Sequence, residues 1–359
     1  MEITIWPEEA NQRFDRFLRK YFKKNVEIGL NDIFAWIRKG VIKVNKRKKS
    51  PEIKLVEGDI ITINIPTETL QPLKKNPLLQ LLGKEEKKKK IDNEVIKRAI
   101  LFEDTNRIFW NKPPGIVVHP GNKHLEDLTM NDYLEEYAGR NKSLTFKPAF
   151  CFRLDKDTSW VIVAAKTYES LQELNKLIRD RKVEKTYCCI VLWTFPEMVT
   201  IDKPLFKWFN KKAGRAQTFV NSEQGSPAIT IASRLLTVEA AYLGTISFVK
   251  VRILTGRMHQ IRTHLSHIHY PIIGDIMYGN QRTNRLVAEK YGIVRQLLHS
   301  FHYSFFDRFS NRKIGVSAPL PEDFKKFISN SDERKHLAAV IWRSEWRHKI
   351  RETSDDHDY

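Results

Sequence analysis

The chain has 359 residues, of which 41% are hydrophobic and 11% aromatic, so it can bury a proper core and is not disordered throughout. Its formal net charge of +19 favours a polyanionic partner, most simply a nucleic acid, over an anionic membrane surface. No apolar run reaches the roughly 18 residues of a spanning helix, no signal peptide opens the chain, and three cysteines offer neither a disulfide framework nor a zinc spacing. We therefore expect a cytoplasmic monomer that does not associate with membranes.

Residues 1–65 have the pattern of a small domain with two helices followed by two strands. Apolar residues recur at helical spacing from Phe14 to Phe22, and basic residues fill the other positions. A second short helix should end at Gly40, and residues 41–45 and 60–65 read as strands. The basic residues could form a merely solvated face, but their clustering favours RNA contact, and the candidates are Arg13, Arg16, Lys43, Lys46, Arg47 and Lys48.

Residues 66–96 have the composition of a linker. They contain three prolines and the charge run 85–90, a composition that usually marks a boundary with few crossing contacts. The apolar stretch 78–82 inside this linker could dock on either neighbouring domain. At the other end of the chain, residues 331–359 predict a basic amphipathic helix with an acidic end. Packing on the preceding domain is favoured for this helix over an additional RNA contact.

Residues 97–330 alternate short strands, turns and helices, as expected of one larger domain. The predicted strands are 108–110, 116–118, 161–165, 185–193 and several runs within 198–255. The predicted helices lie within 124–138, 171–178 and 259–267. This mixture predicts an α+β fold with a mostly antiparallel mixed sheet, preceded by a small N-terminal α/β domain.

Charge is concentrated in the loop that precedes the predicted strand 161–165. This loop carries Arg153, Asp155, Lys156 and Asp157, and the apolar strand after it would hold the loop against a rigid core. Rigid support is what a catalytic carboxylate requires, since small misplacements reduce the rate strongly. From spacing alone, a surface salt-bridge loop is the better interpretation, and the sequence does not separate Asp155 from Asp157.

A second stretch, residues 254–279, crowds Arg257, His259, Gln260 and Arg262 together, followed by Gly-Asp at 274–275 and Tyr-Gly at 278–279. With the loop at 151–159, this stretch resembles the RluA-type family of RNA pseudouridine synthases, over roughly residues 97–330. Weaker matches in the same order are Asn-Lys-Pro-Pro-Gly at 111–115, Lys-x-Tyr at 185–187 and Leu-His at 298–299. Residues 1–65 separately resemble an S-four-type RNA-binding domain.

The family resemblance implies an enzyme that converts uridine to pseudouridine in structured RNA without a cofactor or a metal. It maps the catalytic carboxylate onto Asp155, its arginine partner onto Arg262 and the pocket tyrosine onto Tyr187. It suggests that Arg153 fills the base stack when the uridine is flipped out, a step that costs a few kcal/mol; a simple phosphate contact is the alternative. The remaining substrate-binding candidates are Lys112, His119, Arg257, His259 and Gln260. The histidines of 259–269 have no recognisable metal-ligand spacing.

The chain departs from the family pattern near the catalytic loop. Phe152 stands where the family has His, and Trp160 stands where it has Gly. We therefore hold two hypotheses: a pseudouridine synthase acting on 23S ribosomal RNA, or an RNA-binding or ribosome-assembly protein with reduced or lost catalysis. A synthase that acts on transfer RNA is a further alternative, because RNA shape as much as direct contacts sets the target uridine.

Overall fold

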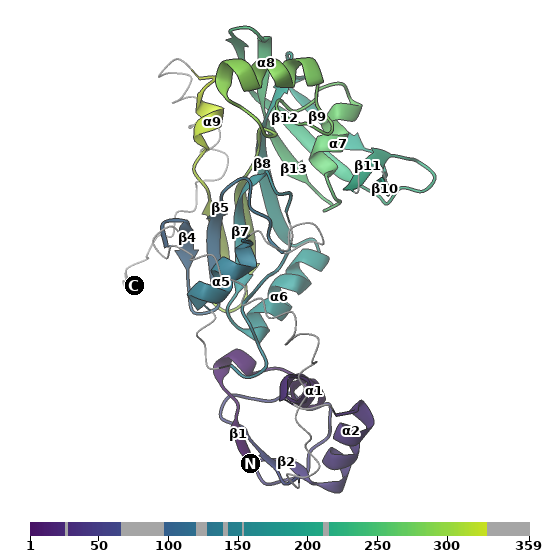
Figure 1. Ribbon diagram of the computed structural model, residues 1–359, viewed down its shortest axis with the longest axis vertical. Helices are drawn as coiled ribbons and strands as arrows, with labels where there is room; N and C mark the ends of the chain where they lie inside the picture. Colours follow the sequence, from purple (N-terminus) through teal and green to yellow (C-terminus); the bar gives the residue numbers. More distant parts are fainter. Residues whose placement is uncertain are drawn as a thin grey trace, which may run out of the picture. The chain divides into compact units, whose positions relative to one another are not determined.

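A computed structural model describes residues 1–25, 28–65, 97–119, 128–138, 143–152, 154–210 and 215–328 (Figure 1). Its contacts divide the chain into two compact units. The first unit comprises Met1–Phe109, Val118–Arg153 and Ile162–Lys176, and the second comprises Trp110–Val117, Leu154–Val161 and Leu177–Tyr359. The predicted linker with its apolar stretch and the predicted C-terminal helix lie outside the described residues. The three boundaries between the four segments drawn from the sequence remain predictions.

The N-terminal part of the first unit contains the predicted two helices and a three-stranded antiparallel sheet. Its elements are β1 (Glu2–Thr4), the 3-10 helix η1 (Pro7–Glu9), α1 (Phe14–Asn25), α2 (Leu30–Lys39), β2 (Ile42–Val44) and β3 (Ile60–Ile63), with the strand order β1-β3-β2. The helical spacing is confirmed, because Phe14, Phe17 and Phe22 of α1 are buried in one apolar cluster. The predicted end of the second helix is also confirmed: Gly40 follows α2 with a φ of 73°, in the left-handed region that glycine adopts at low cost.

A tight turn after β2 presents the basic cluster of this part of the chain. Asn45 and Lys46 have positive φ angles of 49° and 62°, and the backbone groups of Val44 and Arg47 bond each other across the turn. Asn tolerates this conformation, and here its side chain also bonds Asp59 and the Ile60 N–H. Consequently Lys46, Arg47 and the following Lys48 are exposed to solvent.

The remainder of the first unit is α+β. It contains β4 (Ile100–Glu103), α5 (Met130–Ala138), β6 (Ala149–Phe150) and α6 (Tyr168–Arg179), and β6 pairs antiparallel with the end of β7 (Ser159–Ala165). Both β5 (Arg107–Lys112) and β7 contribute residues to each unit. The predicted buried strand 161–165 is confirmed, since Val161 to Ala165 are each 0% exposed.

A mixed sheet forms the centre of the second unit. β8 (Val183–Leu192) lies between β14 (Leu298–Asp307) and β13 (Gly244–Ile253), and the antiparallel order continues through β12 (Ile229–Ala240) to β9 (Met198–Asp202). β15 (Arg312–Ser317) also pairs antiparallel with β14, whereas the first residues of β7 pair with β14 in parallel. The predicted α+β fold with a mostly antiparallel mixed sheet is confirmed.

The two faces of β8 have different neighbours because side chains alternate along a strand. Cys188, Ile190 and Leu192 belong to an apolar core with Val287 of α8 (Gln281–Tyr291) and Phe324 of α9 (Glu322–Lys325). Tyr187 therefore points to the opposite face. A separate hairpin of β10 (Leu205–Asn210) and β11 (Arg215–Val220) lies beside α7 (Gln260–His267) (Figure 1).

One local prediction requires correction, and one helix was not predicted. Residues 116–118 do not form a strand, because the Ile116 carbonyl is turned to the buried ammonium of Lys112. Helix α8 was not predicted, since its sequence is largely polar and only Val287 is buried.

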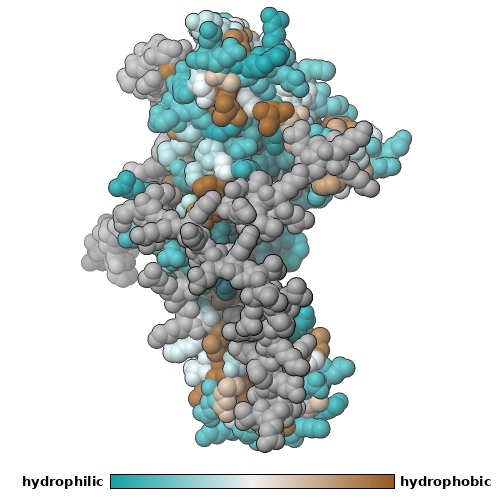
Figure 2. Space-filling model, in the orientation of Figure 1, coloured by the Kyte–Doolittle hydropathy of each residue, from teal (hydrophilic) through white to brown (hydrophobic). Residues whose placement is uncertain are grey.

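Among the residues drawn in colour in Figure 2, most of the surface is hydrophilic, with small groups of hydrophobic side chains exposed among the polar ones. The β10–β11 hairpin contributes exposed aromatic residues: Trp208 is 45%, Phe209 is 57% and Phe219 is 45% exposed. Trp208 and Phe219 lie side by side, with ring centroids 6.3 Å apart.

No helix among the described residues is long and apolar enough to cross a membrane.

Candidate active site

A buried lysine organises the loop that carries Asp155. Lys112, at the end of β5, is 0% exposed, and its Nζ donates to the carbonyls of Pro113 at 2.9 Å, Ile116 at 2.7 Å and Lys156 at 2.9 Å. An ammonium has three N–H donors, and all three are used. Lys112 therefore holds two loops together next to Asp155, and its substrate-binding role stays a prediction. Burial lowers the pKa of Lys112 to about 7, although the nearby charge of Asp157 acts in the opposite direction.

The other side of the same loop is held by residues next to β14. The Arg295 guanidinium donates to the Asp157 carbonyl at 3.1 Å and forms an ion pair with Asp323 at 2.7 Å. At the start of β7, the Ser159 hydroxyl bonds Nδ1 of the fully buried His299 at 2.9 Å. Burial lowers the pKa of His299 to about 3, so this imidazole is neutral at pH 7. The loop around Asp155 is therefore fixed by buried polar groups on both sides.

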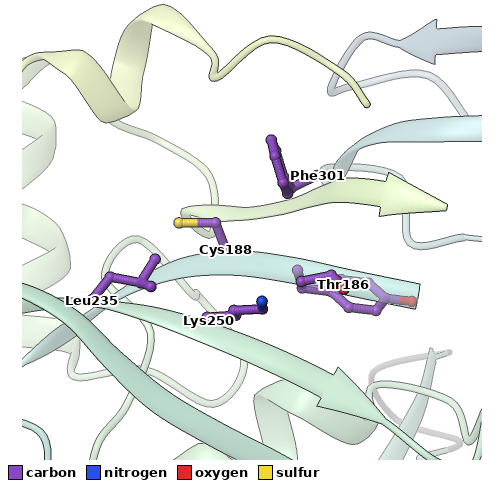
Figure 3. A pocket seen from close by; sticks show the side chains of 6 residues that line it. Thr186, Cys188, Leu235, Lys250 and Phe301 are labelled. Atoms are coloured by element: carbon purple, nitrogen blue, oxygen red, sulfur yellow. The ribbon is translucent and has the colours of Figure 1, made fainter. Parts of the chain in front are cut away.

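Tyr187 lies on β8 and is only 4% exposed. It lines a pocket with side chains from four neighbouring strands, and the other lining residues are Thr186, Cys188, Leu235, Lys250 and Phe301 (Figure 3). Burial raises the pKa of Tyr187 well above its usual value, and the negative charge of Asp155 adds to the effect.

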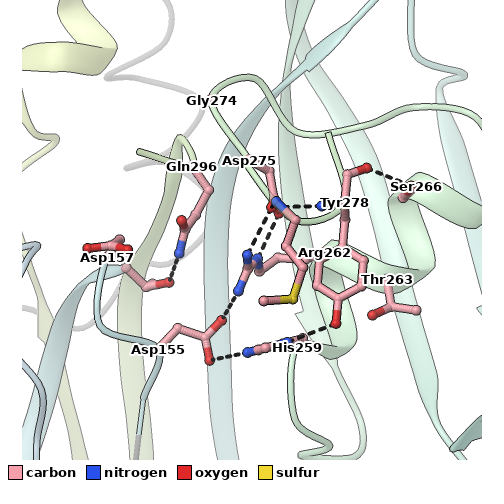
Figure 4. Close-up of polar contacts among 12 residues, drawn as sticks. Asp155, Asp157, His259, Arg262, Thr263, Ser266, Gly274, Asp275, Tyr278 and Gln296 are labelled. Carbon is pink, nitrogen blue, oxygen red and sulfur yellow. Dashed lines mark hydrogen bonds and ion pairs between the residues drawn. The ribbon is translucent and has the colours of Figure 1, made fainter. Parts of the chain in front are cut away.

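The centre of the site is a chain of three charged side chains, Asp155, Arg262 and Asp275 (Figure 4). Nη1 of Arg262 donates to Oδ2 of Asp155 at 2.9 Å, so the predicted carboxylate–arginine pair is present. The opposite edge of the same guanidinium donates to both oxygens of Asp275, from Nε at 2.7 Å and from Nη2 at 2.8 Å. Bidentate contacts of this kind fix orientation as well as charge. The Asp155 side chain keeps 24% exposure, whereas Arg262 has 6% and Asp275 has 1%.

His259 faces the other oxygen of Asp155. Its Nε2 lies 3.7 Å from Oδ1 of Asp155, and its Nδ1 is 2.8 Å from the hydroxyl of Tyr278. His259 adopts a positive φ of 52° immediately before α7, which aims the side chain at the loop. Burial lowers the pKa of His259, against the opposing effect of Asp155.

Gln260 and His264 have structural roles. Gln260 is 3% exposed; its amide nitrogen donates to the Ile229 carbonyl and the Thr230 hydroxyl, and its oxygen accepts two further hydrogen bonds. The Gln260 amide therefore joins α7 to the sheet, and its substrate contact stays a prediction. Both ring nitrogens of His264 are likewise bonded within the core, to Thr230 and to the Lys203 carbonyl.

The other predicted site residues are not all brought to this cluster. Arg257 is exposed and donates from Nε to the Pro227 carbonyl at 3.1 Å. His119 belongs to the first unit, where its ring bonds the Asn131 amide. Arg153 and the side chain of Trp160 lie outside what the structure describes. In the N-terminal part, Arg13 is paired with Asp15 at 2.9 Å and Glu52 at 3.4 Å, so its charge is neutralised and an RNA contact is not supported for it.

The sequence interpretation missed the roles of Asp275 and Tyr278. Both stand in the stretch that carries the family resemblance, and this position was the available signal. Within the described ranges, no group of three or more His, Cys, Asp or Glu side chains is arranged to hold a metal ion.

Comparison with known proteins decides the family. A family model described as RNA pseudouridylate synthase matches residues 106–267, which include Asp155, Tyr187 and Arg262. The ribosomal large subunit pseudouridine synthase C of Buchnera aphidicola subsp. Schizaphis graminum is 34% identical over 328 residues, covering 91% of this chain and 96% of that protein. The chain belongs to the RluA-type family of RNA pseudouridine synthases. This pseudouridine synthase is also 30% identical over 332 residues to the synthase C of Buchnera aphidicola subsp. Baizongia pistaciae, with 91% and 96% coverage.

The fold of this pseudouridine synthase also occurs in a solved human structure. Human RNA Pseudouridylate Synthase Domain Containing 4 is similar with a TM-score of 0.51 and 24% identity, over 69% of this chain and 95% of that one. This likeness concerns the fold. Family membership makes the enzyme an isomerase, and the solved structure shows the same fold. Asp155 and Arg262 both lie in the part of the chain that the family model matches.

Proposed function

We propose that this enzyme isomerises specific uridines in large-subunit ribosomal RNA and that Asp155 is its catalytic group. The ribosomal substrate is supported by the names of the two bacterial relatives. The match with this chain covers 96% of the length of each relative. The observation that carries the catalytic proposal is the hydrogen bonding of Asp155. Its Oδ2 is held by Arg262 at 2.9 Å, while Oδ1 has no hydrogen bond of normal length to any residue in the described part of the chain.

The reaction needs one such carboxylate oxygen. The bond between uracil N1 and ribose C1′ breaks, the base turns, and C5 bonds to C1′; the proton leaves C5, and N1 ends with a proton. Atoms and electrons balance without an oxidant or a leaving group, so the proposal uses no cofactor. Asp155 Oδ1 acts either as the nucleophile at the sugar or as the base that removes a ribose proton, and both roles require the ionised form. The adjacent Arg262 guanidinium stabilises that negative charge.

Tyr187 contacts the base in this proposal. Because burial and the charge of Asp155 raise its pKa, its hydroxyl remains protonated at neutral pH. A protonated phenol donates a hydrogen bond and does not serve as a phenolate base. We therefore assign Tyr187 to stacking on the uracil and to hydrogen bonding, and Arg153 to the space that the flipped base leaves.

RNA affinity is assigned to two surfaces. The exposed basic residues of the N-terminal part, Arg16, Lys46, Arg47 and Lys48, provide phosphate contacts, as does the half-buried Lys43. The exposed rings of Trp208 and Phe219 on the β10–β11 hairpin offer faces on which unpaired bases can stack, a contact worth about 1–3 kcal/mol per base.

The test compares ribosomal RNA from cells that lack the gene with RNA from cells supplied with wild type, Asp155→Asn or Asp157→Asn. Asn is nearly isosteric with Asp but supplies neither charge nor nucleophile. We expect pseudouridines to be missing from 23S RNA in the deletion strain, restored by wild type and Asp157→Asn, and not restored by Asp155→Asn. Asp157 is the matched control because it lies two residues away on the same loop, and its backbone carbonyl makes the bond to Arg295.

Each alternative has its own outcome in this experiment. Full restoration by Asp155→Asn would overturn the catalytic assignment. Missing pseudouridines in transfer RNA, with 23S RNA intact, would overturn the substrate. A ribosome-assembly defect that Asp155→Asn repairs, with no pseudouridine missing, would favour the RNA-binding protein with lost catalysis that Phe152 and Trp160 suggest.

A further inference from the structure

The turn from Gly274 to Gly279, sequence Gly-Asp-Ile-Met-Tyr-Gly, has no role in the mechanism so far. We propose that this turn is the positioning element of the catalytic carboxylate, with Asp275 setting the guanidinium of Arg262 and Tyr278 setting the imidazole of His259. Both oxygens of Asp155 are then faced by groups whose orientation this one turn determines. The inference rests on the proposed catalytic role of Asp155.

Asp275 determines where Arg262 points. The guanidinium is planar and rigid, so fixing two of its nitrogens fixes the direction of the third. Asp275 binds Nε at 2.7 Å and Nη2 at 2.8 Å, and the remaining Nη1 is thereby directed at Asp155, 2.9 Å away. With 1% of its side chain exposed, Asp275 has little freedom to rotate away.

Asp275 also determines how much positive charge Asp155 experiences. An isolated Arg262–Asp155 pair would be neutral, and the arginine would strongly mask the attacking carboxylate. The second carboxylate leaves the three groups with one net negative charge, so Asp155 is oriented while retaining its reactivity. Burial of Asp275 opposes ionisation, but its bonds from Arg262 and from backbone N–H groups outweigh this effect and lower its pKa.

Tyr278 determines the orientation and the tautomer of His259. Its hydroxyl accepts the Thr218 N–H at 2.8 Å and lies 2.8 Å from Nδ1 of His259. We assign the hydroxyl proton to Nδ1, which leaves the single proton of the neutral imidazole on Nε2, facing Oδ1 of Asp155 at 3.7 Å. The charged groups that face His259 are Asp155, Arg262, Asp275 and Lys207.

The turn behaves as one piece because the Asp275 carboxylate also binds its own backbone. Oδ1 accepts the N–H of Met277 at 2.9 Å and of Tyr278 at 3.0 Å. The carboxylate that aligns Arg262 therefore also fixes the residue that aligns His259. The Arg262 guanidinium further lies over the Tyr278 ring, 5.1 Å from its centroid.

Neighbouring structure holds the turn in place. The Asn284 amide of α8 accepts the Gly274 N–H at 2.9 Å and donates to the Asp275 carbonyl at 2.7 Å. Gly274 has a φ of 79°, and a Cβ there would lie 1.9 Å from the Arg295 carbonyl oxygen. A Cβ on Gly279 would lie 2.3 Å from the Asp275 carbonyl oxygen. Both glycines are thus required by close backbone approach.

The test uses the full chain and measures the single-turnover rate and RNA affinity of Asp275→Asn and Tyr278→Phe. We expect Asp275→Asn to reduce the rate about 100-fold and Tyr278→Phe about 10-fold, with RNA affinity within about twofold of wild type, as expected for interactions that act in the transition state. Adding Asp275→Asn to Arg262→Met should cost little further rate, because Asp275 acts through that guanidinium. A purely structural role would instead add its own loss of rate.

Asp307→Asn is the matched control, because Asp307 is a fully buried carboxylate that accepts the Ser310 N–H and hydroxyl at the end of β14. We expect it to keep the wild-type rate. A near-wild-type rate in Asp275→Asn, with Asp155→Asn inactive, would overturn this inference alone. An active Asp155→Asn would instead overturn the proposed function. If Asp275→Asn does not fold, an unchanged rate in Tyr278→Phe is sufficient to refute the positioning role.

Discussion

Replacing Lys112 by Met tests whether a buried ammonium holds the catalytic loop. Met preserves much of the length and the apolar packing of the lysine stem, so the change removes mainly the charge and its three hydrogen bonds to Pro113, Ile116 and Lys156. At about 1–1.5 kcal/mol net for each bond, the loss of three bonds amounts to about 3–4.5 kcal/mol of folding stability. The rate of pseudouridine formation should fall as well, because the loop that carries Asp155 loses the hydrogen bond from Lys112 to the Lys156 carbonyl.

The same substitution predicts a pH dependence. Burial lowers the pKa of Lys112 from 10.5 to about 7, so above pH 7 the folded protein releases a proton that the unfolded chain keeps up to about pH 10.5. Stability rises with pH wherever the unfolded state binds more protons, and the contribution between pH 7 and 9 is about 2 kcal/mol. Met does not titrate. The difference in stability between wild type and Lys112→Met should therefore change by this amount across that interval.

Thermal unfolding of the full chain at pH 6, 7, 8 and 9 provides the measurement. A change of about 2 kcal/mol corresponds to a relative shift in Tm of roughly 4–8 °C for a protein somewhat smaller than this one. Lys313→Met is the control, since Lys313 forms an ion pair with Glu184 and both side chains are at least half exposed. Parallel Tm curves for wild type and Lys112→Met would refute the titration of Lys112. Equal stability of wild type and Lys112→Met at every pH would refute the stabilising role of the Lys112 hydrogen bonds.

The remaining predictions concern catalysis and RNA affinity. Arg262→Met should remove most activity, and adding it to Asp155→Asn should cost little more, because residues that act as a unit are not additive; an additive loss in single-turnover assays would contradict this. RNA affinity should fall steeply with salt, and alanine at Lys46, Arg47 and Lys48 should reduce the slope of log K against log salt by about 2 to 3. Arg13→Ala should leave that slope nearly unchanged, because Arg13 is already paired with Asp15.

Elements with a strong apolar period could be predicted from the sequence. The buried face of α1 repeats at helical spacing, and β7 is a short apolar run bounded by turn residues. The prediction failed where a polar group determines the backbone. Residues 116–118 are apolar enough for a strand, but the ammonium of Lys112 draws in the Ile116 carbonyl. The sequence around Lys112 and Ile116 does not indicate this hydrogen bond, because it forms only when the lysine is buried in the fold.

The residues of the candidate site also fall into two groups, those that could be predicted from the sequence and those that only the folded structure reveals. Asp155 and Arg262 were paired through the family resemblance, although they are 107 positions apart in the chain. Gln260 was assigned to the substrate because it stands among residues of the same motif, yet its amide is used within the fold. Asp275 lies 13 residues after Arg262, and only the folded backbone shows that its carboxylate reaches that guanidinium. Sequence proximity thus indicates the neighbourhood of a site, whereas hydrogen-bond partners assign roles within it.

Helix α7 has consequences for how this enzyme can diversify. Residues Gln260 to Leu265 are all buried, so for six consecutive positions the helix has no solvent-facing side. In a saturation mutagenesis experiment, these positions should form a continuous block of intolerance in place of the alternating pattern of an ordinary surface helix. Variation that retargets the enzyme to another uridine is then expected at exposed positions outside this block. Paralogues with different RNA targets should accordingly keep this helix while their exposed surfaces diverge.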